Sequence, residues 1–73
     1  MKSFEIDRIE YESRLKRYED ENILGNYSCF KNEQGLIRDI KLSGDNEKSL
    51  RKVEKDNKIR YFFIDTGSLE NKV

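Results

Sequence analysis

Hydrophobic positions in the first third of the chain follow the period of an α-helix. At about 100° per residue, the side chains of Phe4, Tyr11, Leu15 and Tyr18 lie within about 60° of one another. Charged residues occupy the remaining faces. This pattern predicts an amphipathic helix over residues 3–24.

The ends of this helix rest on capping signals. The start has two alternatives: Ser3 caps the helix, or Asp7 followed by Glu10 forms a capping box. In the second case residues 4–6 form a short segment ahead of the helix. Gly25 is the predicted stop, because glycine tolerates the left-handed backbone that ends many helices.

From residue 26 the hydrophobic period shortens towards two, which is the period of a β-strand. Leu50 and Val53 also fit the spacing of a helical turn, but we favour a highly charged edge strand for their segment. Residues 67–73 are interpreted as a tail. The predicted strands, separated by polar turns, cover residues 26–32, 36–43, 49–54 and 58–65.

These elements predict a single α+β domain over residues 1–73. An N-terminal amphipathic helix packs on one face of a three- to four-stranded antiparallel β-meander. Hydrophobic residues make up 34% of the chain and charged residues 41%, against roughly 25% charged in an average domain. The core is therefore built from few side chains, and we expect the four Phe and four Tyr residues to carry it.

Cysteine content and the first residues indicate the compartment. The chain has one cysteine, Cys29, so it forms no internal disulfide, whereas small secreted domains usually contain several. Charges near the N-terminus and the lack of a long apolar run argue against a signal peptide or membrane span. We expect a cytoplasmic protein in which Cys29 is a buried apolar residue, with a redox-sensing thiol as the alternative.

The residue inventory argues against catalysis. There is no histidine, which removes the commonest general base near neutral pH and both the Ser-His-Asp and Cys-His arrangements. One thiol and no imidazole also exclude a structural zinc site. The four glycines lie in separate turns and form no phosphate-binding loop. We expect no enzyme activity, no cofactor and no metal.

The last predicted strand is apolar on both faces. If the helix covers Ile59, Tyr61 and Phe63, with Leu36, Ile40 and Leu42 beside them, the other face is left uncovered. In the alternative, the sheet curls into a small barrel or the tail with Leu69 and Val73 covers Phe62. The candidate partner-binding residues on the uncovered face are Ile37, Asp39, Lys41, Arg60, Phe62 and Ile64.

This face predicts a small non-enzymatic protein-binding module that regulates or inhibits a larger macromolecule, or that forms a homodimer. A chain that lacks Ala, Pro, His and Trp is typical of an AT-rich bacterial or phage genome, where small domains often modulate host or defence machinery. The alternative is a nucleic-acid-binding domain. In it Tyr61 or Phe62 stacks on bases, and the phosphate contacts are Arg38, Lys41, Arg51, Lys52, Lys58 and Arg60.

Overall fold

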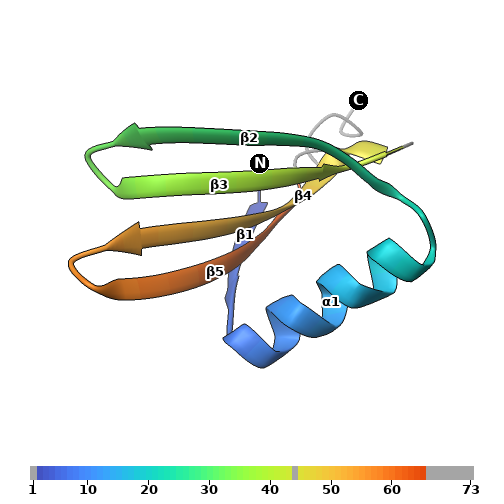
Figure 1. The fold of residues 1–73 in the computed structure, drawn as a ribbon, viewed down its shortest axis with the longest axis horizontal. Helices are drawn as coiled ribbons and strands as arrows, with labels where there is room; N and C mark the ends of the chain where they lie inside the picture. The colour runs from blue at the N-terminus through green and yellow to red at the C-terminus, as the bar shows by residue number, and fades with distance from the viewer. Residues whose placement is uncertain (1, 44, 66–73) are drawn as a thin grey trace.

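A computed structural model describes residues 2–43 and 45–65 and shows an α+β domain (Figure 1). A single helix accompanies one five-stranded antiparallel sheet in this part of the chain. The predicted tail at 67–73 lies outside the described residues. In chain order the elements are β1 (Lys2–Ile6), α1 (Arg8–Asp20), β2 (Leu24–Asn32), β3 (Gly35–Leu42), β4 (Asp45–Lys55) and β5 (Lys58–Asp65).

The helix is shorter than the predicted 3–24, because strong caps stop it at both ends. The Asp7 side chain accepts a hydrogen bond from the Glu10 backbone N–H at 2.7 Å, so the later of the two predicted starts is correct. At the other end, Asn22 adopts a φ of 59° and the Ile23 N–H bonds to the Tyr18 carbonyl. This is a Schellman motif with asparagine in the left-handed position. Gly25, the predicted stop, instead lies within β2.

Residues 2–6 form a fifth strand that the sequence did not predict. Strand β1 pairs with β5, and the paired residues include Phe4 with Phe63 and Ile6 with Tyr61. The sheet order is β1-β5-β4-β3-β2. The sheet therefore has five strands, where three to four were expected. Phe4, which was placed on the helix stripe, lies in this strand with 51% of its surface exposed.

The predicted meander is present in the remaining four strands. Consecutive strands from β2 to β5 pair with their neighbours, and segment 49–54 lies inside β4 as a strand. The prediction that it is an edge strand is wrong, because β4 lies between β3 and β5 in the sheet order. Asp56 and Asn57 link β4 to β5 with φ values of 54° and 64°, the signature of a two-residue type I′ hairpin turn. The β2–β3 and β4–β5 turns lie at the same end of the sheet (Figure 1). The Lys55 Nζ donates to the Glu33 carbonyl at 2.7 Å and links these two turns.

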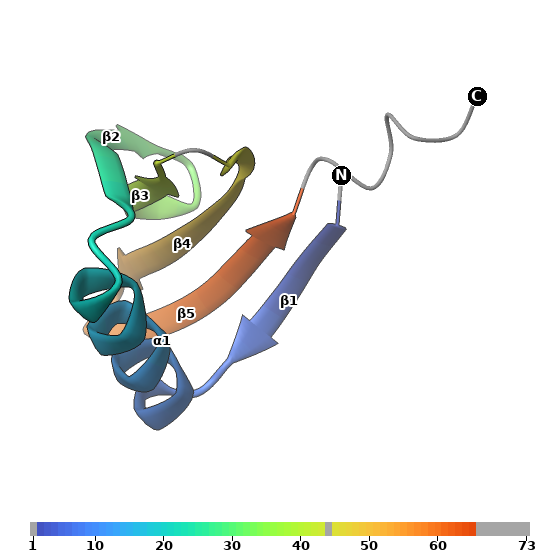
Figure 2. The same cartoon turned by 90° about the vertical axis from the view of Figure 1, so that its right-hand side faces the viewer.

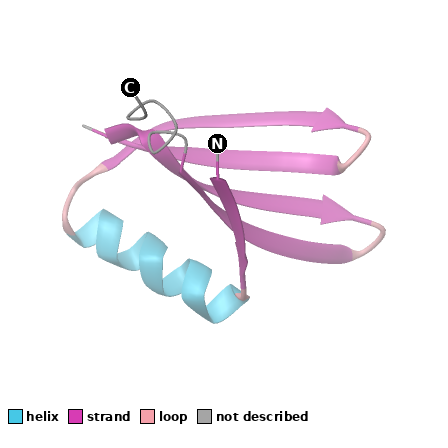
Figure 3. Cartoon of the chain, turned by 180° about the vertical axis from the view of Figure 1, so that it is seen from behind, coloured by secondary structure: helices cyan, strands magenta, loops and turns pink. Residues whose placement is uncertain are grey.

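The main core lies between the helix and one face of the sheet (Figures 2 and 3). Tyr11 and Tyr18 of the helix are buried with Leu42 and Leu50 of the sheet, as the helical period predicted for the two tyrosines. The ring centroids of Tyr11 and Tyr61 are 4.7 Å apart. The partly buried residues that pack against this cluster are Ile6, Leu15, Ile23, Leu24, Tyr61 and Phe63.

Candidate functional site

The face of the sheet opposite the helix carries all six predicted site residues. Tyr61 and Phe63 pack against the helix-side core, so the alternating residues of β5 project from the other face. The strand registers extend this relation across the sheet, because directly paired residues share a face. We call this surface the far face. It includes the predicted set Ile37, Asp39, Lys41, Arg60, Phe62 and Ile64.

The six predicted site residues differ in how exposed their side chains are. Ile37 is 1% exposed and Ile64 5% exposed, so the expectation that these two side chains are accessible is wrong. Ile37 is shielded laterally, because Phe30 and Val53 are its direct cross-strand neighbours on the same face. Phe62 is half-buried, which leaves it as the accessible aromatic of the predicted set.

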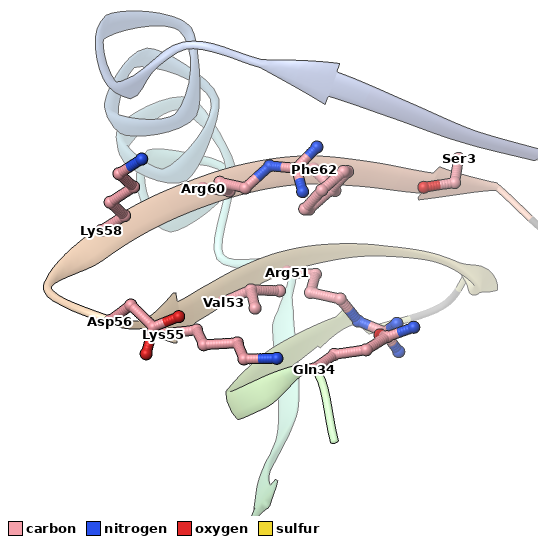
Figure 4. Close-up of a pocket in the computed structure, with 9 residues that line it drawn as sticks. All are labelled: Ser3, Gln34, Arg51, Val53, Lys55, Asp56, Lys58, Arg60 and Phe62. Carbon is pink, nitrogen blue, oxygen red and sulfur yellow. The ribbon is translucent and has the colours of Figure 1, made fainter. Parts of the chain in front are cut away.

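Phe62 lines a groove on the far face with a volume of about 680 Å³ (Figure 4). Val53 of β4 supplies the other apolar side chain, and both residues lie among long charged side chains. Strands β1, β4 and β5 and both hairpin turns contribute to its walls. We call this the far-face groove, and its lining residues are Ser3, Gln34, Arg51, Val53, Lys55, Asp56, Lys58, Arg60 and Phe62.

Two arginines of the groove are held by carboxylates on neighbouring strands. Arg51 donates to both Asp39 oxygens, with Nε and Nη2 each at 2.8 Å. Asp39 and Arg51 are direct cross-strand partners, so the register itself sets up this bidentate pair. The hydrogen bond to Asp39 raises the pKa of Arg51 above its ordinary value. The guanidinium is therefore fixed in place and charged.

Arg60 forms the second pair, with Glu5 of β1, at 3.0 and 2.8 Å. The hydrogen bond from Arg60 holds the pKa of Glu5 below its ordinary value. The Arg60 guanidinium carbon also lies 5.2 Å from the centroid of the Phe62 ring, within cation–π range. Arg60 thus connects the edge strand to the aromatic floor of the groove.

These pairs reduce the positive charge of the groove. Four of its lining residues are basic and one, Asp56, is acidic. Asp39 and Glu5 neutralise Arg51 and Arg60, which leaves Lys55 and Lys58 against Asp56. The groove therefore carries a small net positive charge around an apolar floor.

The residues proposed for nucleic-acid contact do not form one surface. The Tyr61 ring packs at a tilt against Tyr11 on the helix side of the sheet, so this ring face is not free to stack on a base. Arg38 and Lys52 share that side through the strand registers, and both pair with Glu54, at 3.3 and 3.9 Å. Of the proposed phosphate contacts, the far-face groove contains Arg51, Lys58 and Arg60.

Sequence reasoning did not place Val53, Gln34, Lys55 or Ser3 in the site. For Val53 the signal was present: once 49–54 is read as a strand with Leu50 towards the helix, alternation places Val53 on the same face as Phe62. Ser3 was not predictable in this way, because residues 3–6 were assigned to the helix. Gln34 lies in the β2–β3 turn and Lys55 is next to the β4–β5 turn. The distance between these two turns depends on the twist of the sheet, which the sequence pattern does not give.

Cys29 is exposed on β2, so its predicted burial is wrong. Its side chain shares the helix-side face with Arg38, its cross-strand partner. Within residues 2–43 and 45–65, no group of three or more His, Cys, Asp or Glu side chains is arranged to hold a metal ion.

Comparison with protein-family models, with curated proteins and with solved structures gives no match to this chain. The helix in the described part of the chain is too short and too polar to cross a membrane.

Proposed function

We propose that this chain is a small non-enzymatic protein-binding module whose far-face groove binds a segment of a larger protein. The observation that carries the proposal is the half-buried Phe62 beside Val53, enclosed by arginines that are already fixed by Asp39 and Glu5. An apolar floor with a charged rim is the usual arrangement of a protein interface. Fixed arginines lose little side-chain entropy on binding.

The chemistry of the groove indicates the bound segment. An apolar side chain of the partner contacts Phe62 and Val53, and a carboxylate on the same segment contacts Lys55 or Lys58 at the rim. By occupying a surface of the partner, the module acts as a regulator or inhibitor. Its proposed origin in an AT-rich bacterial or phage genome rests on composition alone.

The groove fits a protein better than a nucleic acid. Phosphate binding requires several uncompensated cations, because affinity scales with the number of phosphates that are neutralised. Here Arg51 and Arg60 are already paired within the chain. A labelled single-stranded oligonucleotide should therefore bind weakly, and tight binding with a steep salt dependence would instead support the nucleic-acid alternative.

The test compares Phe62→Asp with a control that alters an aromatic outside the groove. Phe62→Asp places a charge on the groove floor, whereas Phe4→Asp changes a side chain that is 51% exposed elsewhere. Proteins captured from the native cell by the tagged chain should be retained by Phe4→Asp and lost with Phe62→Asp. Circular dichroism confirms that both variants are folded.

The result is decisive only for the folded variants. If folded Phe62→Asp captures the same proteins as the wild type, the groove is not the binding surface. Ile64→Asp is not a suitable variant, because Ile64 is 5% exposed and a charge there is expected to unfold the domain.

A further inference from the structure

Strand β2 is an edge strand with unusually little protection. It is the last strand in the sheet order, so among the described residues no strand pairs with its outer side. Natural edge strands are usually protected by charges, by proline or by being short. Strand β2 runs for nine residues, and Lys31 is its single charged residue. Tyr27 is 69% exposed on it and Phe30 43% exposed.

The other strands make this contrast clear. The opposite edge, β1, has five residues and carries Lys2 and Glu5. Strand β4, which is in the middle of the sheet, has seven charged residues among eleven. The chain as a whole is 41% charged, yet β2, a long edge strand that charges would protect from pairing, has the lowest fraction of charged residues among the strands.

The hairpins determine which backbone groups of β2 point outwards. In a two-residue hairpin the residues that flank the turn are a hydrogen-bonded pair, and bonded and non-bonded pairs then alternate. Counting from Asn32 and Gly35 along β2, the N–H and C=O groups of Ser28 and Phe30 point towards β3. Counting from Lys55 and Lys58 across β4 and β3 gives the same assignment. The groups of Tyr27, Cys29 and Lys31 therefore point to the free side.

A bulge limits the usable length of this edge. The register between β2 and β3 shifts between Leu24 and Tyr27, so the regular part of β2 is residues 27–32. Its three outward-pointing residues, Tyr27, Cys29 and Lys31, are symmetric about Cys29. An antiparallel strand that uses all three must match this spacing, and a second copy of β2 does so when Cys29 faces Cys29.

We propose that this chain forms a homodimer in which the β2 strands of two copies pair antiparallel about a two-fold axis at Cys29. The two sheets then join into one continuous sheet, with two hydrogen bonds for each of the three residue pairs. This interface uses an edge of the sheet, whereas the proposed protein-binding function uses the far-face groove. Either proposal therefore stands or fails without the other.

The side chains are compatible with this register. Tyr27 of each copy faces Lys31 of the other, so the single charge of the strand lies beside an exposed aromatic ring and no like charges face each other. On the other face of β2, Phe30 of one copy lies opposite Ser28 of the other. Every pair formed by residues 27–31 is therefore free of electrostatic repulsion.

The register is tested by two substitutions at Tyr27. Tyr27→Lys places two lysine pairs face to face in the dimer, whereas Tyr27→Glu places glutamate opposite Lys31 in both pairs. Both changes are at a largely exposed position, so the monomer is expected to stay folded in each variant, which circular dichroism checks. Light scattering coupled to size-exclusion chromatography is expected to show a wild-type dimer at about 100 μM chain. Tyr27→Lys should dissociate about tenfold more readily than Tyr27→Glu.

Thiol cross-linking gives a second readout. In the proposed register the two Cys29 Cα atoms are about 5.5 Å apart, so a short bismaleimide should link the two chains. Cys29→Ser should remain a dimer and lose the cross-link. A wild-type monomer at this concentration overturns the proposal. So does equal dissociation of Tyr27→Lys and Tyr27→Glu, and so does a dimer that Phe62→Asp separates while Tyr27→Lys does not.

Discussion

At the scale of single residues, Tyr11 is an ionisable side chain that lies in the small core. Tyr11 is 7% exposed, lies against Tyr61 and packs with Leu42 and Leu50. Its ring contributes buried apolar surface to this cluster. Burial raises the pKa of Tyr11, and the nearby Tyr61, Tyr27 and Asp39 add to the shift.

This shift predicts a loss of stability in alkali. Because the pKa of Tyr11 is higher in the folded chain, the unfolded chain releases the proton first, at its ordinary value of about 10. The stabilisation is complete below that pH and is lost as the pH rises through the folded-state pKa. Tyr11→Phe removes this titration, so its free energy of unfolding should fall less than that of the wild type above about pH 10.

Urea unfolding at neutral and alkaline pH measures the difference. Tyr18→Phe is the matched control, because Tyr18 is a second buried tyrosine of the same helix and is not among the groups that raise the pKa of Tyr11. An unchanged alkaline loss of stability in Tyr11→Phe would contradict the argument.

Phe4 and Cys29, two residues that the sequence misplaced, share one physical cause. Tyr11 and Tyr18 were placed correctly, because hydrophobic residues at helical spacing predict which side of the helix is buried. Phe4 was placed on the stripe by spacing alone, and Cys29 was assigned to the core because cysteine is usually buried. Their exposure depends on which strands are at the edges, since an edge strand has a neighbour on one side only.

At the scale of elements, the end of α1 is determined by Asn22. Its φ of 59° is a left-handed conformation that costs most residues about 1–2 kcal/mol, but costs glycine little. Asparagine tolerates it better than most residues because its short side chain bonds locally. The Ile23 and Asn22 N–H groups satisfy two of the last helical carbonyls, and Ile23 packs on the core.

Two substitutions at Asn22 test this end of the helix. Asn22→Ala is expected to lower the free energy of unfolding by about 1 kcal/mol, since alanine is strained at a positive φ. Asn22→Gly should be neutral or slightly stabilising at the same position. Chemical denaturation of the two variants measures the difference, and equal stabilities would show that backbone strain is not what stops the helix.

Strand β1 shows what local pattern cannot predict. Ser3, Phe4 and Ile6 fit a helix start as well as a short strand, and the alternation of a five-residue segment is too brief to decide between them. The pairing with β5 decides, because five backbone positions of β1 gain partners there. By contrast, β2 to β5 were predictable, since each is bounded by turn residues and joined to the next by a short loop.

At the scale of the whole molecule, stability depends on very few side chains. Leu50 is fully buried, at 0% exposed, and lies in the central part of the sheet against the helix. A domain of this size is expected to have a free energy of unfolding of about 4–11 kcal/mol. Each core residue therefore accounts for a large share of the total.

Leu50→Ala is expected to lower the free energy of unfolding by about 2–5 kcal/mol. A substantial fraction of the molecules should then be unfolded at 37 °C, or the remaining stability should be small. Ile59→Ala is the control, because Ile59 is 48% exposed and should cost less than about 1 kcal/mol. Thermal denaturation followed by circular dichroism compares them. Similar melting temperatures for the two variants would mean that the helix-side cluster is not the main core.

The place where the chain enters and leaves the sheet has a mechanical consequence. Lys2 and Asp65 are paired at one end of the adjacent antiparallel strands β1 and β5. A force that pulls these two residues apart loads the pairs one after another, starting from Lys2 and Asp65, and never all five together. The domain should therefore open at low force by peeling off β1, which removes Glu5 from Arg60 and Ile6 from the core before the meander yields.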